Sequence, residues 1–204
     1  QASFDMALSK ISNKTGFWGG GINIFNDEAG VSEMGTFQAN LSFAYHLYVG
    51  ENSTLGAGLM GGFAQRSINY DNLKWGSQFD GYSYNSALQP GEPAGSDKIN
   101  YLDLGGGLVW NYSKGEKYMS GNDQRKAKVG IAVFHPHSPD YSFYKTGEKL
   151  NMKLVLHGDM LIGIANTNLS VLPGIIYYSQ GKLSELNGGA MFRYLLKHES
   201  NYTG

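Results

Sequence analysis

The strongest constraint on the fold is a two-residue alternation of apolar and polar side chains over unusually long segments. From Thr36 to Val49, every second residue is apolar, and the residues between them are mostly polar. Successive side chains of a β-strand point to opposite faces, so this segment is predicted to be a strand with one apolar and one polar face. The alternation recurs along the chain, and no stretch shows a convincing helical period. The sequence therefore predicts an all-β protein.

About nine strands are expected, and most are longer than the roughly 5–6 residues usual in soluble proteins. At ~3.3 Å per residue and a tilt of ~40°, such strands can cross an apolar band of ~25 Å. No linker or internal repeat separates them, so residues 1–204 are expected to form a single β-barrel domain. The strands are predicted near residues 3–12, 16–26, 35–49, 54–70, 100–112, 127–135, 150–164, 168–178 and 185–197.

The pattern favours an antiparallel up-and-down transmembrane β-barrel over a soluble barrel or sandwich with its apolar face inward. Charged residues within the predicted strands lie on the polar face, which suits a water-filled lumen. Aromatic residues gather near the strand ends, as in the aromatic girdles at the two membrane interfaces. The connections 27–34, 71–99, 136–149 and 179–184 share one end and are mostly long. The others are short except 113–126, which predicts an outer-membrane barrel with extracellular long loops.

A bacterial barrel closes with an even number of strands, so nine strands predict a partial barrel that lacks strands at both ends. The lumen is predicted to hold a network of polar and charged side chains, which are Arg66, Asp103, Lys153, His157, Asp159 and Arg193.

Composition and motifs exclude several function classes. The formal net charge of −1 gives no reason to expect nucleic acid as a partner, and the absence of cysteine removes thiolate metal sites and cysteine nucleophiles. His135 and His137 flank a proline, and this pattern favours a strand end over a metal site. His157 and Asp159 share a face, which leaves an outer-membrane lipid hydrolase as an alternative, but no nucleophile motif accompanies them. No cofactor, no metal and no catalytic residue is predicted.

Five segments, in order, resemble the PorP/SprF family of Bacteroidetes. They are the hairpin from Gly19 to Gly30 with its Asn-Asp-Glu-Ala-Gly sequence, the run from Gln38 to His46, the stretch from Leu59 to Asp80, the segment from Val129 to Phe143, and the C-terminal part from Leu172 to Gly189. The family often has an Asn-x-Pro-Asn form after the histidine, whereas this chain has Pro136-His-Ser-Pro139-Asp140.

The resemblance implies a non-enzymatic outer-membrane component of the type IX secretion system and of gliding motility. Some members of the family are core secretion machinery, and others bind and anchor a secreted surface adhesin through its type B C-terminal domain. The implied partners are such an adhesin, other secretion components and outer-membrane lipid. An outer-membrane solute channel is the alternative function.

The family-like motifs cluster near the predicted extracellular end instead of spreading along the strands. A cluster at one rim suits recognition of a folded domain, with Trp75, Tyr141 and Phe143 as expected aromatic anchors. Turn formation is the alternative role of Asp27 and Gly30. The residues predicted to bind the partner are Asn26, Asp27, Trp75, Gln78, Asp80, His135, Pro139, Tyr141 and Phe143.

Overall fold

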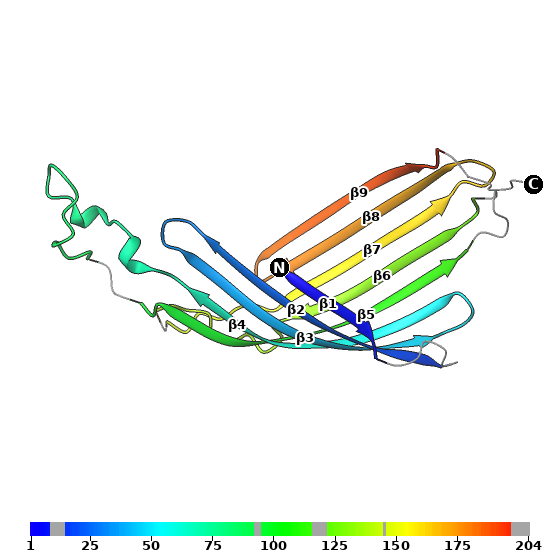
Figure 1. Ribbon diagram of the computed structural model, residues 1–204, viewed down its shortest axis with the longest axis horizontal. Helices are drawn as coiled ribbons and strands as arrows, with labels where there is room; N and C mark the ends of the chain where they lie inside the picture. The colour runs from blue at the N-terminus through cyan, green and yellow to red at the C-terminus, as the bar shows by residue number, and fades with distance from the viewer. Residues whose placement is uncertain (9–14, 92–94, 116–121, 145, 197–204) are drawn as a thin grey trace, which may run out of the picture.

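The alternating segments form nine strands that follow one another in a single antiparallel sheet, ordered β1 to β9 as in the sequence (Figure 1). The computed structural model describes residues 1–8, 15–91, 95–115, 122–144 and 146–196. The strands are β1 (Ala2–Ala7), β2 (Gly16–Ala29), β3 (Met34–Tyr48), β4 (Ser53–Ser67), β5 (Lys98–Lys114), β6 (Arg125–Phe134), β7 (Lys153–Gly163), β8 (Leu169–Gln180) and β9 (Leu183–Tyr194).

The predicted all-β fold is confirmed, and each predicted strand corresponds to one observed strand. Within the described ranges the helical elements are two 3₁₀ turns, η1 (Tyr70–Asn72) and η2 (Gly76–Gln78). Among these residues there is no helix long and apolar enough to cross a bilayer. Several strand ends differ from prediction by two or three residues, and β1 ends at Ala7. At the ends of β2 and β8 the strands extend farther than expected, because the ladder continues through polar residues into tight turns.

The register separates the side chains into two faces that run unbroken across the sheet. Leu41 lies opposite Gly61, which lies opposite Leu104, so both leucines share one face. Asn40 lies opposite Gly62, which lies opposite Asp103, so these two polar residues share the other. The same registers place Leu154 and Phe192 with the leucines, and Lys153 and Arg193 with Asp103. The predicted separation into an apolar face and a polar face is confirmed.

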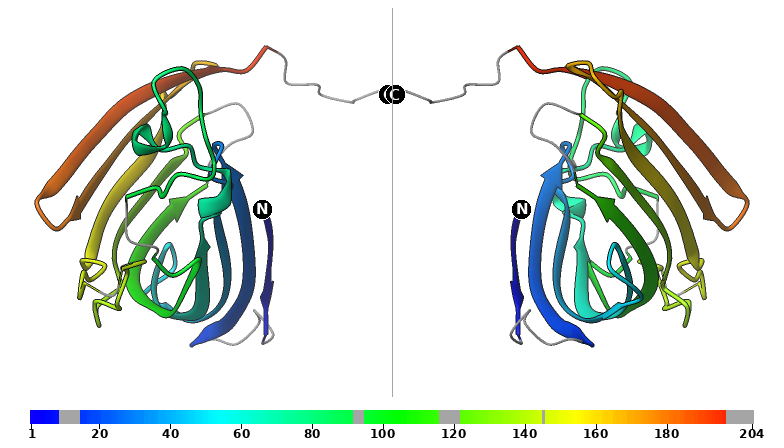
Figure 2. Two further views of the ribbon diagram at one scale, coloured as in Figure 1. Left: turned by 90° about the vertical axis from the view of Figure 1, so that its left-hand side faces the viewer. Right: turned by 90° about the vertical axis from the view of Figure 1, so that its right-hand side faces the viewer.

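The sheet is strongly curved (Figure 2), and the burial of its side chains identifies the polar face as the enclosed side. Every buried non-glycine residue of the described strand positions lies on it, namely Asn40, Ala64, Tyr101, Asp103, Val155 and Ser170. Side chains on a concave face converge and shield one another, whereas those on a convex face spread apart. The apolar face is accordingly exposed, with Leu41 at 52% and Leu59 at 74%. Because β1 and β9 do not pair with each other, the structure is a partial barrel that does not close.

Glycines on the polar face make room for large side chains of the neighbouring strand. The Asn40 side chain lies over Gly62, and the His157 ring lies over Gly130, so closely that a Cβ at either glycine would collide with it. Glycine inside a strand costs conformational entropy, but it permits this close approach. The high glycine content of the sequence is thus explained in part by packing on the concave side.

Candidate functional site

The four connections at one end of the sheet form a continuous structure, which we call the rim. It consists of the described residues in 30–33, 68–97, 135–152 and 181–182. Two of these connections are long, as predicted. The predicted bounds of the other two, 27–34 and 179–184, were wrong, because β2 continues to Ala29 and β8 to Gln180. Their turns are short and begin with the positive-φ glycines Gly30 and Gly181.

Hydrogen bonds join each connection of the rim to the next. The amide N–H of Asn69 donates to the carbonyl of Ser32 (2.7 Å), and the Asn69 side chain donates to Glu33 Oε2 (3.1 Å). Farther along, the Ser96 N–H donates to the carbonyl of Phe143 (2.7 Å). The last link comes from the end of β8, directly before its turn, where Gln180 Nε2 donates to the Asn151 carbonyl (3.0 Å). A chain of contacts therefore spans the whole rim, and the four connections hold one another in place.

The connection between β6 and β7 covers a stretch of β5 that β6 does not reach. The β5–β6 ladder stops at Gly105, although β5 begins at Lys98. On the rim side of Gly105, the His135 N–H donates to the Leu104 carbonyl (2.9 Å), and His137 Nε2 lies 2.9 Å from the carbonyl oxygen of Leu102. His135 Nδ1 also lies 2.6 Å from Asp103 Oδ1. The two imidazoles therefore engage different groups along the β5 edge, and they do not converge on one point.

Arg66, on the polar face of β4, anchors the same connection from the other side. Its guanidinium donates a hydrogen bond to the hydroxyl of Tyr141 and lies 4.9 Å from the centre of that ring and 5.9 Å from the ring of Phe143. Tyr141 also packs edge-on against Tyr101 of β5, with ring centroids 5.8 Å apart. Cation–π and hydrogen-bond contacts of this kind fix a loop in position. Arg66 and Asp103 thus hold the rim to the mouth of the barrel.

The outer part of the β4–β5 connection, residues 74–91, forms a separate unit that we call the tip. Among the described residues, its hydrogen bonds, its β-bridge and its cation–π contact each join two residues of the tip. Gln78, which is 7% exposed, accepts a hydrogen bond from the Trp75 N–H through Oε1 and donates to the Leu88 carbonyl through Nε2. Figure 1 shows the tip projecting well beyond the strand ends. Its inner neighbours, residues 68–73 and 95–97, contact the rest of the rim instead.

Asp80 gives the tip a fixed negative charge. The amide N–H groups of Ser83 and Tyr82 each donate to Asp80 Oδ1 (2.9 Å), and these bonds lower the pKa of the carboxyl below its ordinary value. The turn they close carries Tyr82 outward, while a short β-bridge pairs Phe79 with Tyr84. A small polar turn therefore presents aromatic side chains to the surroundings.

The exposed aromatics of the rim are not the ones that the sequence singled out. Tyr82 is 96% exposed and Phe79 is 59% exposed, whereas Trp75, Tyr141 and Phe143 are partly covered. Tyr141 and Phe143 face Arg66, so they act mainly in holding the loop. Sequence reasoning missed Phe79 and Tyr82 because the apolar character of a loop aromatic does not show whether its side chain turns inward. The Asp80 turn, which fixes their direction, is the signal that was available.

The remaining predicted partner-binding residues lie at the same end of the sheet. Asn26 and Asp27 belong to the last part of β2, on the apolar and polar faces respectively, and both are exposed. Asp27 shares a row with Thr36 and Arg66. Pro139 accepts a hydrogen bond from the Leu150 N–H (2.9 Å), which closes the base of its connection.

The predicted lumen residues share the polar face but do not gather into one network. Asp103 pairs with His135, Arg66 contacts the rim aromatics, and Lys153 Nζ lies 4.9 Å from the centre of the Tyr178 ring. Arg193 lies opposite Ser170 on β8. In the ranges that the structure describes, no ion pair joins any two of the six residues. His157 and Asp159 lie farther down the same face of β7, near the middle of the wall.

Comparison with known proteins returned one match. The sequence model of the family described as type IX secretion system membrane protein PorP/SprF matches residues 1–200. No curated protein and no solved structure matches the chain.

Proposed function

Because this chain belongs to the PorP/SprF family of type IX secretion system membrane proteins, we propose that its rim binds and anchors a secreted surface adhesin. The bound part is the adhesin's type B C-terminal domain, and the barrel lies in the bacterial outer membrane with the rim outside the cell. The protein acts by binding and not by catalysis. Residues 1–204 belong to a single β-barrel domain.

The observation that carries this proposal is the construction of the rim. Four connections, far apart in the sequence, are joined by hydrogen bonds into one surface, and the tip extends from it with Phe79 and Tyr82 exposed. Aromatic residues supported by a fixed scaffold are typical anchors of protein interfaces. Because the scaffold is already ordered, little conformational entropy is lost on binding.

The identity of the bound protein is tested by purifying the tagged protein from native outer membrane and identifying the proteins that co-purify with it. We expect a large secreted protein with a type B C-terminal domain, held at the surface. An outer-membrane solute channel is the alternative function. If no such protein accompanies it and the intact barrel conducts ions like a porin in planar bilayers, the channel is the better assignment.

The outward orientation of the rim is tested by labelling single cysteines, which is unambiguous because the native chain has none. Ser77, in the tip, and Ala165, in the β7–β8 connection, are exposed and lie at opposite ends of the sheet. A membrane-impermeant maleimide should label Ser77→Cys in intact cells and Ala165→Cys only after the outer membrane is permeabilised. The reverse order would invert the orientation. Ser12, a natural choice at the inner end, lies outside the described residues.

A further inference from the structure

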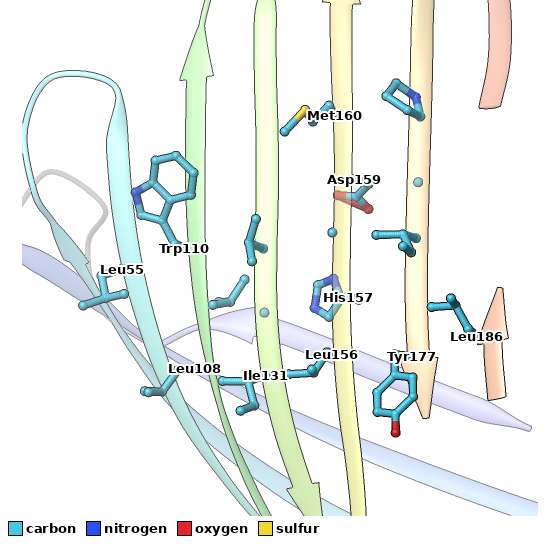
Figure 3. A pocket seen from close by; sticks show the side chains of 17 residues that line it. Leu55, Leu108, Trp110, Ile131, Leu156, His157, Asp159, Met160, Tyr177 and Leu186 are labelled. Atoms are coloured by element: carbon cyan, nitrogen blue, oxygen red, sulfur yellow. The ribbon is translucent and has the colours of Figure 1, made fainter. Parts of the chain in front are cut away.

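The apolar face carries a groove of about 720 Å³ across β4 to β9. One of its walls is a single row of large side chains on neighbouring strands, as the register shows and Figure 3 illustrates. These are Leu108, Ile131, Leu156, Tyr177 and Leu186. The next row toward the end opposite the rim is hollow, because Gly158 lies between Val129 and Ile175 and has no side chain to fill the space.

The surroundings of the groove indicate what kind of molecule fills it. The groove lies in an exposed apolar face that continues over β3 and β4, with Leu41 at 52% and Leu59 at 74% exposure. In a membrane protein, such a face contacts lipid hydrocarbon. Water in a groove lined this way would be unfavourable, since apolar surface gains free energy when it leaves water. An acyl chain is the occupant that this apolar lining favours.

Two cations lie on the same face just beyond the groove, at the end opposite the rim. Lys114 of β5 and Arg125 of β6 are directly opposite each other in the ladder. Like charges in this position repel each other. In the described part of the chain, neither has a carboxylate within ion-pair distance. Trp110, which lines the groove, stacks on Tyr112 with ring centroids 6.2 Å apart, and Tyr112 lies between Trp110 and Lys114 along the same face of β5. Lys114 is four residues beyond Trp110, about 13 Å along the strand.

We propose that this surface is a specific phospholipid site. One acyl chain lies in the groove over Gly158, and the anionic phosphate headgroup lies between Lys114 and Arg125. The lipid belongs to the leaflet at the end of the barrel opposite the rim. The phosphate relieves the repulsion between the two cations, and the aromatic pair marks the level of the membrane interface. The site does not depend on which protein the rim binds.

The site is tested by native mass spectrometry of the full-length protein, extracted from its membrane and then exchanged into vesicles of phosphatidylethanolamine with phosphatidylglycerol. We expect the wild type to retain a phospholipid and to prefer phosphatidylglycerol. Arg125→Gln should weaken that preference about fivefold, the usual effect of one basic residue near an anionic surface. Gly158→Leu should reduce retention of either lipid, because the new side chain fills the groove.

The matched controls make the same kinds of substitution elsewhere on the same face. Lys98 lies at the rim end of β5, and Gly61 lies on β4 where a Cβ would meet only Leu104. Lys98→Gln and Gly61→Leu should retain lipid like the wild type. Heat-modifiable migration on gels verifies that each variant is folded. Equal lipid retention in Arg125→Gln and Lys98→Gln, or in Gly158→Leu and Gly61→Leu, would overturn the proposal.

Discussion

Replacing Leu41 by arginine should destabilise the barrel by about 2–4 kcal/mol, the usual cost of a cation on the lipid face near the bilayer midplane. Leu41 lies at the centre of β3 on the apolar face, and 52% of its surface is exposed. A charge placed there loses its hydration without gaining a partner. The free energy of unfolding is measured by urea titration of the protein folded into vesicles.

The matched variant for this experiment is Ser42→Arg, one residue farther along the same strand. Ser42 lies on the polar face opposite Gly21 and Met60, and Asp5 lies opposite Gly21 in the same row, so an arginine at position 42 has a carboxylate on its own face. Its cost should be much smaller than that of Leu41→Arg. If Ser42→Arg destabilised the protein more than Leu41→Arg, the apolar face would be the interior of a soluble fold, and the membrane assignment would fail.

Replacing the tip, residues 74–91, by a short glycine–serine linker should abolish retention of the adhesin at the cell surface while the barrel still assembles. Among the described residues, the contacts of the tip are internal. The links that hold this connection to the rest of the rim come from residues 68–73 and 95–97, which this change leaves intact. Surface adhesin is measured by antibody binding to intact cells, and barrel assembly by heat-modifiable migration on gels.

A smaller change narrows the effect to the exposed aromatics. Phe79→Ser/Tyr82→Ser should weaken adhesin binding by about thirtyfold for each residue replaced, because anchor residues in interfaces contribute about 2 kcal/mol or more each. Val49→Ser, which removes an exposed apolar side chain at the opposite end of the sheet, should have no effect. Full surface retention in the linker variant would place the binding site elsewhere.

The faces and strand order were predictable because they depend on local alternation. Leu41 and Asn40 are assigned to opposite faces by their parity alone, and the register agrees. The turns at Gly30 and Gly181 were misjudged because polar residues such as Asp27 and Glu28 suit both an exposed strand end and a loop. In this case the ladder with β3 extends the strand through them.

The candidate site was predicted in outline but not in detail. Its place at one end followed from the clustering of motifs, and the structure brings these segments together. The roles of individual side chains depend on contacts between distant segments, such as Arg66 with Tyr141 or Asp103 with His135. No local pattern contains that information, and so residues assigned to the lumen and residues assigned to partner binding are in direct contact.

The uneven lengths of the ladders on either side of β4 and β5 have a mechanical consequence. A load on the tip pulls β4 and β5 together along their axes, so the hydrogen bonds between them carry little shear. The shear falls on the two outer ladders. The β3–β4 ladder includes β3 residues Gly35 to Tyr48, whereas the β5–β6 ladder includes only β6 residues Arg125 to Phe134. The β5–β6 boundary is thus the weaker seam under tension. The contacts of His135 and His137 with β5 reinforce this seam where the strand pairing stops.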